Sequence, residues 1–564
     1  MEGRIDSEVI VVGAGPAGSA CAISLARKGV DVLLLEKARI PGERNVTGGV
    51  LYGEYLKGYG LVDLVPEFEK EAPLQRKVSR HDLYVLSNQS STGQYKYYKM
   101  TKDSLPSRMG LFNLDFGTDH DYTVLKRDFD RWLALKAAEE GAMLATSTTV
   151  EDLILEDGRV VGVRTTHEDL RSKLVVDCSG VTSTLVDRAS LRKPLRPFQV
   201  YHGIKHVYKM TGEVIEKRFG LKPGEGEARF YLGDFMKGIS GGAFLYTNKD
   251  TISIGLVLTL SSFVKGATTK FDRVGKPLNI LEDFERHPML AELLESAELV
   301  EYSAHNIPRS HTCILETPYM PGLLVAGDAL GSFVKIGALI DGMRRAIASG
   351  IMASETYIHA NEKGNFGLTE LEDYRERLSP IYGDVNRASS DSQISESSLA
   401  YRYLPRLLFS TGLLCKTGTA KVVHIVERSD SIQQVQLRTG LLQYDEDENY
   451  SHIKVDEEKC SRAAMKPWVP ACPVNCYTLL TKKGVFASFH DLYIYNKKSL
   501  GGDPDSSEFD RAAYNQTLRD IAEGSLRFDH VACVACGTCG VIGPKDMVEF
   551  GHERDGHGVR YRYG

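Results

Sequence analysis

The sequence predicts an α/β protein that ends in a separate cysteine-rich module. A strand, a glycine-rich turn, a helix and a second strand follow one another within residues 8–36, and strand and helix patterns then alternate over roughly 400 residues. Six of the ten cysteines lie between residues 460 and 539. In a chain without a signal peptide, such a cluster predicts a metal or iron–sulfur site rather than disulfides.

Length, composition and charge narrow the class of protein further. The chain has 564 residues, of which 42% are hydrophobic and 26% charged, so disordered and collagen-like classes are excluded. At about 150 residues per domain, the length predicts roughly 3 to 4 domains. The net charge of −6 argues against a nucleic-acid partner. Because no run of 18 apolar residues occurs and the N-terminus is charged, we expect neither a transmembrane helix nor a signal peptide.

The expected elements follow from apolar periodicity. Residues 8–12 and 31–36 are predicted strands, and residues 17–28 between them a predicted helix. Residues 127–140 have the pattern of an amphipathic helix. Residues 148–166 predict a hairpin that turns at Glu156-Asp-Gly158.

Composition shifts along the chain predict four segments. Residues 1–195 are the first part of a cofactor-binding domain, and residues 196–305 are an inserted, strand-rich substrate or interaction domain. Residues 306–440 complete the first domain and add a helical region for a membrane surface, and residues 441–564 form the cysteine-rich module. The acidic stretch 443–450 predicts an exposed connection before that module.

The first turn carries a dinucleotide-binding motif of the form G-x-G-x-x-G, which consists of Gly13, Ala14, Gly15, Pro16, Ala17 and Gly18. The first glycine allows the tight turn, the second lets the backbone approach a pyrophosphate, and the third allows close helix–strand packing. The phosphates lie at the helix N-terminus. Glu36 ends the second strand, where a carboxylate can accept a hydrogen bond from a ribose hydroxyl.

Three later features favour FAD over NAD. An apolar strand ends in Gly327-Asp328, where the glycine permits close approach and the carboxylate can bind ribityl hydroxyls. The backbone at Thr149-Val150 can meet the adenine. Arg127 begins its helix and is a candidate for the phosphates, although a surface arginine would give the same pattern.

A second motif predicts a [4Fe-4S] cluster. Cys533, Cys536 and Cys539 form C-x-x-C-x-x-C, and the fourth ligand of such clusters is often a distant Cys-Pro, here Cys472-Pro473. Cys460 and Cys476 are then left over. A zinc site made of Cys472, Cys476, Cys533 and Cys536 stays open as an alternative.

Together these motifs resemble the glutathione-reductase-type FAD superfamily and, within it, the electron-transfer-flavoprotein:quinone oxidoreductase family with its bacterial FixC-type members. The stretches that carry the resemblance are residues 44–49, 302–308, 327–329, 342–343 and 346–350. The C-terminal module resembles the ferredoxin-like FixX protein. We therefore expect FAD to contact, in addition, Lys37, Asn45, Thr47, Gly48, Gly49, Val150, Gly180, Gly342 and Met343.

The resemblance implies a function. Electrons would pass from a two-subunit electron-transfer flavoprotein, through the cluster and FAD, to a membrane quinone. The chain would then lie peripherally on the cytoplasmic face of the cell membrane, with residues 401–425, which mix basic, aromatic and apolar side chains, at the lipid surface. We assign no catalytic acid; His305 is a weak candidate.

The chain also departs from the family pattern. Asp341 precedes the Gly342-Met343 pair and Arg344 follows it, whereas relatives commonly have the opposite order of charges, and residues 336–340 also differ. An FAD-dependent isoprenoid (geranylgeranyl-type) double-bond reductase fed by its own ferredoxin domain is therefore the alternative function. A scaffold subunit with relic cofactors is a third hypothesis, against which an intact set of four cluster ligands argues.

Overall fold

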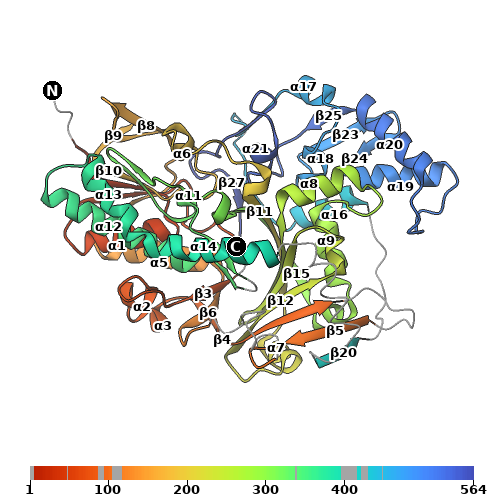
Figure 1. The fold of residues 1–564 in the computed structure, drawn as a ribbon, viewed down its shortest axis with the longest axis horizontal. Helices are drawn as coiled ribbons and strands as arrows, with labels where there is room; N and C mark the ends of the chain where they lie inside the picture. Colours follow the sequence, from red (N-terminus) through yellow and green to blue (C-terminus); the bar gives the residue numbers. More distant parts are fainter. Residues whose placement is uncertain are drawn as a thin grey trace.

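A computed structural model describes most of the chain, namely residues 5–46, 49–86, 95–104, 117–336, 339–395, 416–420, 430–447 and 449–564. Two large mixed sheets and a C-terminal module make up the fold (Figure 1). The α/β class predicted from the sequence is confirmed.

The first sheet contains the predicted strand–helix–strand unit. Its strands run in the order β16 (Tyr319–Met320), β17 (Leu323–Val325), β10 (Asp169–Asp177), β1 (Ser7–Val12), β2 (Val32–Leu35) and β7 (Met143–Ala145). All pairs except β16–β17 are parallel. The hairpin of β8 (Val150–Glu156) and β9 (Arg159–Thr165) joins the edge of β10, as predicted.

Three helices pack together beside this sheet, on the left in Figure 1: α1 (Pro16–Ala26), α5 (Lys126–Glu139) and α12 (Met343–Glu362). Glycine allows α1 and α12 to approach to backbone contact, because a Cβ atom at Gly350 would lie 2.1 Å from the carbonyl oxygen of Ala17. The residues of β1 between Val9 and Val12 are all buried, which explains their continuous apolar pattern.

The second sheet draws on three separate parts of the chain. Its order is β15 (Glu298–Pro308), β11 (Val200–Lys209), β14 (Thr251–Thr259), β13 (Gly241–Thr247), β12 (Glu225–Gly233), β4 (Leu74–Leu86), β5 (Tyr95–Met100) and β20 (Lys416–Ala420). Two further strands, β3 (Val50–Tyr52) and β6 (Asp121–Val124), pair with each other and with β4. The expected boundary at residue 195 therefore divides strands that are hydrogen-bonded, since β4 pairs with β12.

The C-terminal module packs on the second sheet. It contains short strands and the helices α19 (Phe489–Ser499), α20 (Arg511–Glu523) and α21 (Thr538–Ile542). Its core is continuous with that of the second sheet. The buried ammonium of Lys276 crosses this junction and donates to the carbonyl oxygens of Val469 (2.8 Å) and Ala487 (3.1 Å). The module is therefore held to the sheet by polar as well as apolar contacts.

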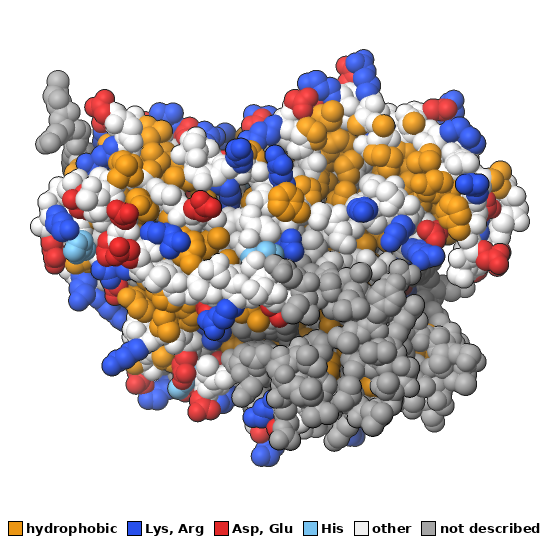
Figure 2. Space-filling view, in the orientation of Figure 1, with side chains coloured by type: hydrophobic (Ala, Val, Ile, Leu, Met, Phe, Trp, Pro, Cys, Tyr) orange, Lys and Arg blue, Asp and Glu red, His pale blue; other side chains and the backbone are white. Residues whose placement is uncertain are grey.

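The surface of this module is partly apolar. Figure 2 shows hydrophobic side chains gathered over it in the upper right. Its exposed large side chains include Leu480, Val485, Tyr495, Leu500 and Phe509. Clusters of exposed apolar side chains are typical of interaction sites.

Most of the segment expected at a lipid surface lies outside the described residues. Of residues 401–425, only β20 is described, and it pairs in antiparallel fashion with β5. Within the described parts of the chain, none of the helices combines the length and the apolar character needed to span a bilayer.

Candidate functional site

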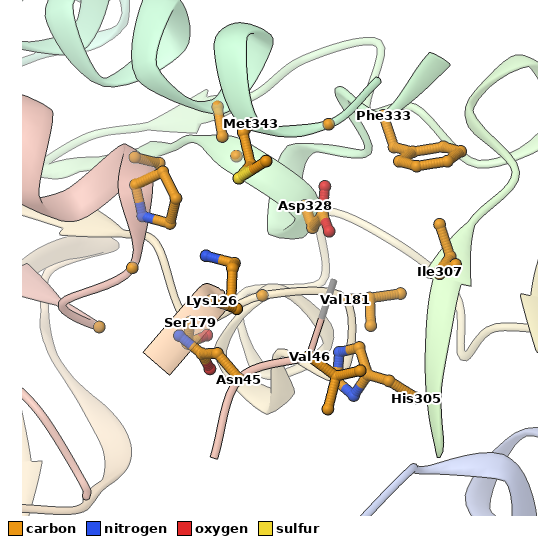
Figure 3. Close-up of a pocket in the computed structure, with 18 of the residues that line it drawn as sticks. Asn45, Val46, Lys126, Ser179, Val181, His305, Ile307, Asp328, Phe333 and Met343 are labelled. Atoms are coloured by element: carbon orange, nitrogen blue, oxygen red, sulfur yellow. The ribbon is translucent and has the colours of Figure 1, made fainter. Parts of the chain in front are cut away.

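An elongated cavity lies where the carboxyl ends of β1, β10 and β17 meet the second sheet (Figure 3). The edge formed by the carboxyl ends of parallel strands is where open α/β sheets bind ligands. Most of the predicted cofactor residues line it: Gly13, Gly15, Pro16, Ala17, Glu36, Lys37, Asn45, Gly49, Val150, Gly180, Gly327, Asp328, Gly342 and Met343. Residues from both sheets thus converge on one cavity.

The glycine turn has the geometry that a pyrophosphate site needs. Gly13 has a φ of +97°, and a Cβ atom there would lie 2.7 Å from the carbonyl oxygen of Cys178. A Cβ atom at Gly15 would meet only Asn45 Nδ2, at 3.8 Å, so the backbone is open to the cavity. Helix α1 begins at Pro16, and no side chain caps its N-terminus. The amide groups of the first turn can therefore bind an anion.

Glu36 is held in place by the backbone. Its Oε2 accepts the N–H of Ala14 (2.9 Å) and its Oε1 accepts the N–H of Ala38 (2.8 Å). Only 9% of the residue is exposed. The carboxylate is thus oriented at the end of β2, with lone pairs left for a ribose hydroxyl.

Asp328 lies in the middle of the cavity, at the start of α11 (Gly327–Leu330) (Figure 3). Its Oδ1 is buried without a hydrogen-bond partner in the described part of the protein. Burial raises the pKa of this carboxyl to about 6, and the nearby charge of Lys126 opposes the rise. A buried acceptor without a partner is costly unless a ligand satisfies it, so Asp328 fits the ribityl hydroxyls of FAD.

The remaining wall is apolar and aromatic. Phe244, Tyr246, Phe333, Ile340 and Met343 line the cavity, and Phe333 and Met343 lie on either side of Asp328 in the view of Figure 3. An extended FAD with its ribose at Glu36 and its ribityl chain at Asp328 would place the flavin ring here. The residues present therefore fit FAD along its whole length.

Some predicted residues lie outside the cavity wall. Ala14 and Gly18 lie behind it, and a Cβ atom at Gly18 would come within 1.9 Å of the carbonyl oxygen of Gly13. Arg127 does not line the cavity; its guanidinium lies 4.0 Å from the carboxylate of Asp128, while Lys126 faces the cavity instead. Successive helical side chains point about 100° apart, so only one of the two can face inward. Thr47 and Gly48 fall outside the described residues.

The structure also adds residues that the sequence patterns missed. Ser179, Lys205 and His552 line the cavity, and His552 comes from the C-terminal module. Its Nδ1 lies 3.3 Å from Lys37 Nζ, and its Nε2 lies 3.1 Å from the carbonyl oxygen of Thr182. Without the fold, nothing in the sequence connects residue 552 with residue 37.

The six C-terminal cysteines divide into two groups. Cys472, Cys533, Cys536 and Cys539 converge on a second, smaller cavity inside the module, as does Cys476. Cys460 does not line it; its Sγ faces the carbonyl oxygen of Met547 at 3.7 Å. Cys476, expected as a leftover, therefore lies beside the predicted ligands.

Hydrogen-bond donors surround the predicted ligands. Cys533 Sγ lies 3.3 Å from the Nε2 of His452 and accepts the N–H of Ala535, also at 3.3 Å, while Cys472 Sγ accepts the N–H of Cys476 at 3.3 Å. N–H groups around thiolates are typical of iron–sulfur sites. Among the described residues, no group of three or more metal-ligating side chains is spaced to hold a single ion.

The two cavities share a wall. Thr538 Oγ1 lies 3.0 Å from His202 Nδ1 on β11 and 3.0 Å from Asn306 Oδ1 on β15. Gly537 (φ +76°) packs on Thr182, since a Cβ atom there would lie 2.5 Å from Thr182 Cγ2. Thr182 follows Val181, which lines the first cavity. The cysteine loop thus lies directly against the flavin side of the molecule.

Buried ion pairs also stabilise the contact between the C-terminal module and the first domain. Glu553 is 4% exposed, and its carboxylate lies 3.6 Å from Lys37 Nζ and 3.5 Å from Arg44 Nη1. Burial raises the pKa of Glu553, but the charges of Lys37 and Arg44 outweigh it and hold the pKa at about 2. Both cations belong to the first domain, so this carboxylate ties the module to it.

Replacing Glu553 with glutamine is expected to destabilise the protein by about 3 kcal/mol, because Lys37 and Arg44 lose their counter-charge. Since its folded pKa lies below the usual 4.5, the stability that Glu553 contributes is present above pH 4.5 and is lost as pH falls toward 2. Thermal unfolding as a function of pH would test this. Glu458→Gln, in an exposed pair with Arg462, is the control; equal effects of both changes would contradict the assignment.

Comparisons with known proteins agree with this site. Residues 8–215 match the family model "FAD dependent oxidoreductase". The chain is 35% identical over 371 residues to protein FixC of Escherichia coli K12, covering 66% of this chain and 81% of the relative. It is 32% identical over 403 residues to the probable electron transfer flavoprotein-quinone oxidoreductase YdiS of the same organism, covering 71% of this chain and 88% of the relative.

A solved structure shares the fold. A geranylgeranyl bacteriochlorophyll reductase-like protein of Thermoplasma acidophilum superposes with a TM-score of 0.52 at 20% identity, over 70% of this chain and 89% of that one. At this identity the likeness concerns the fold alone. The relatives and the family model show that the chain belongs to the FixC-type electron-transfer-flavoprotein:quinone oxidoreductase family of FAD-dependent oxidoreductases.

Proposed function

We propose that this protein passes electrons from a reduced electron-transfer flavoprotein, through a [4Fe-4S] cluster and FAD, to a membrane quinone. The observation that carries the proposal is the wall shared by the two cavities, where Gly537 and Thr538 of the cysteine loop contact Thr182, His202 and Asn306. Cofactors on either side of such a wall would be close enough for electron transfer.

The residues of the chain have distinct parts in this proposal. When bound, FAD would exchange single electrons with the cluster and an electron pair with the quinone. The first-turn amides would hold the pyrophosphate, Glu36 the ribose and Asp328 the ribityl chain. Cys472, Cys533, Cys536 and Cys539 would hold the cluster, and their N–H donors would set its potential.

The identities of the electron donor and acceptor are inferred from the names of the relatives. The name of YdiS contains both electron transfer flavoprotein and quinone. The sequence has one G-x-G-x-x-G unit, which is used here by FAD, so a protein donor suits it better than a nicotinamide. A membrane quinone implies that the protein binds at a lipid surface. Our proposal is that residues 401–425 contact the lipid and that the protein lies on the cytoplasmic face of the membrane.

Anaerobic stepwise reduction of the purified protein would test the proposal. We expect flavin absorbance in the visible spectrum and one S = ½ cluster signal in EPR. A short-chain quinone should reoxidise both the reduced flavin and the reduced cluster. Reduced electron-transfer flavoprotein should then reduce both centres again.

Other outcomes would point elsewhere. If the flavin and the cluster can both be reduced but are not reoxidised by a quinone, the isoprenoid double-bond reductase would be favoured. Stoichiometric zinc in place of iron would contradict the electron path through the module.

A further inference from the structure

A buried group of titratable side chains lies at the flavin end of the first cavity and has no part in the function proposed above. It consists of Tyr52 on β3, His81 on β4 and Asp121 on β6. Tyr52 and Asp121 are 1% exposed, and the side chain of His81 is 9% exposed. The inference drawn from it rests on the proposed function, because it concerns the protons of quinone reduction.

Quinone reduction needs protons as well as electrons. Each turnover combines one quinone, two electrons and two protons to give one hydroquinone. Electrons that arrive singly through a cluster from a reduced flavoprotein bring no protons, so both must come from solvent. The side chains of Phe244, Phe333 and Ile340 on the cavity wall carry no titratable group, so a polar path from solvent would bring protons to this part of the cavity.

The three residues are in mutual contact. Tyr52 and Asp121 lie directly opposite each other on antiparallel strands, so their side chains share one face of the sheet. His81 Nε2 lies 4.0 Å from Asp121 Oδ2, and the His81 ring is stacked on the Tyr52 ring with centroids 6.2 Å apart. Small rotations or one water molecule would join them into a hydrogen-bonded chain.

His81 and Asp121 form the outer end of this group, and they lie beside a glycine at the surface. Gly117 is exposed, and a Cβ atom there would lie 3.1 Å from His81 Nε2 and 3.2 Å from Asp121 Oδ2. His120, which directly precedes β6, is half-exposed and contacts the carboxylates of Glu54 (3.3 Å) and Glu69 (2.8 Å). Next to Gly117, Thr118 donates its N–H (2.7 Å) and its hydroxyl (2.6 Å) to the Asp121 carboxylate. Among the described residues, Gly117 and Thr118 therefore lie between this carboxylate and the surface.

The inner end reaches the cavity wall. Tyr52 packs in one apolar cluster with Tyr246 and Phe333, both of which line the cavity. The guanidinium of Arg344 lies 4.9 Å from the centre of the Tyr52 ring and pairs with Asp341, and these two residues flank the cavity residues Gly342 and Met343. Tyr52 thus connects the buried acids with the place where the flavin ring would lie.

We propose that Asp121, His81 and Tyr52 carry protons from solvent at Gly117 to the flavin end of the cavity during quinone reduction. The protonation states suit this role. Burial raises the pKa of Asp121 to about 6 and lowers the pKa of His81 to about 4. Near neutral pH the Asp121 carboxylate can therefore take up a proton and release it again, and a neutral His81 can accept a proton and pass it on.

The test compares two electron acceptors in the full-length protein, with electron-transfer flavoprotein as donor. A short-chain quinone takes up protons on reduction, whereas ferricyanide takes one electron and no proton. Tyr52→Phe, His81→Gln and Asp121→Asn are expected to slow quinone reduction by roughly 10- to 100-fold and to leave ferricyanide reduction unchanged. Tyr59→Phe, whose hydroxyl contacts Glu355, is the matched control.

Two further readouts separate proton transfer from a structural effect. The wild-type quinone rate should fall as pH rises through about 6, and Asp121→Asn should remove that dependence. The charged or titratable neighbours that could also contribute are Glu54, His120, Tyr246, Asp341 and Arg344. The solvent deuterium isotope effect on quinone reduction should increase in Tyr52→Phe, which removes one oxygen and should retain flavin even where Asp121→Asn does not.

The outcomes are distinguishable. Wild-type quinone rates and isotope effects in all three variants would overturn the proton path while leaving the proposed function intact. Equal losses with quinone and ferricyanide would also overturn it, because the defect would then lie in electron transfer. A wild-type protein that reduces ferricyanide but no quinone would overturn the proposed function, and this inference with it.

Discussion

Cys536→Ser is expected to yield a protein that retains FAD but has lost its iron–sulfur cluster. Cys536 lines the module's cavity and lies between Ala535 and Gly537, which both have positive φ, so the loop presents its thiol inward. Serine cannot replace a soft thiolate at an iron site without a large loss of affinity. Iron content and the S = ½ signal should fall to background, and electron transfer from the flavoprotein donor to quinone should fall with them.

Neighbouring cysteines supply the controls for this experiment. Cys460→Ser changes a buried thiol outside the cavity and should keep the cluster. Cys476→Ser should also keep it, although Cys476 lies next to Cys472 and Cys533. If Cys476→Ser lost the iron while Cys472→Ser retained it, the assignment of the fourth ligand to Cys472 would have to be abandoned.

Gly18→Ala is expected to abolish FAD binding. The added Cβ atom would lie 1.9 Å from the carbonyl oxygen of Gly13 and 3.2 Å from Val11 Cγ1. Because the nearest atom is backbone, which cannot rotate aside, the turn between β1 and α1 must open, which costs about 1–3 kcal/mol. The measurement is the flavin content of the purified variant and its affinity for added FAD.

A glycine elsewhere in the chain provides the comparison. Gly383 is exposed in helix α14 (Ser379–Ser395), and a Cβ atom there would meet nothing within 4 Å. Gly383→Ala should therefore retain FAD and gain up to about 1 kcal/mol of stability from higher helix propensity. Normal flavin content in Gly18→Ala would show that the turn is not the pyrophosphate site.

Local patterns predicted those features that depend on residues close together in the chain. The strand–turn–helix–strand unit of residues 8–36, the hairpin at residues 156–158 and the C-x-x-C-x-x-C loop appear in the structure where expected. Each needs only short-range information, namely a φ that glycine adopts, a period of buried side chains, or thiols at fixed spacing. The sequence therefore sufficed for the cofactor turn and three of the predicted cluster ligands.

Local patterns could not predict the contacts between segments that lie far apart in the chain. Lys126 rather than Arg127 faces the cavity because of the rotation of α5, which tertiary packing sets. His552 and Lys37 meet, and so do Glu553 and Arg44, across some 500 residues of chain. Strands β3 to β6 join the second sheet through pairing with β12, although they precede it by more than 100 residues.

The sequence by itself thus determined the class of fold and the flavin family, and it predicted candidate residues for binding phosphate and iron. It could do so because the spacing of glycines, acidic residues and cysteines acts locally. Only the tertiary structure decided that the cysteine loop lies against the wall of the flavin cavity. It also decided that Tyr52, His81 and Asp121 come together beneath that cavity. The physical reason is that burial and strand pairing bring together groups whose separation along the chain carries no signal of their contact.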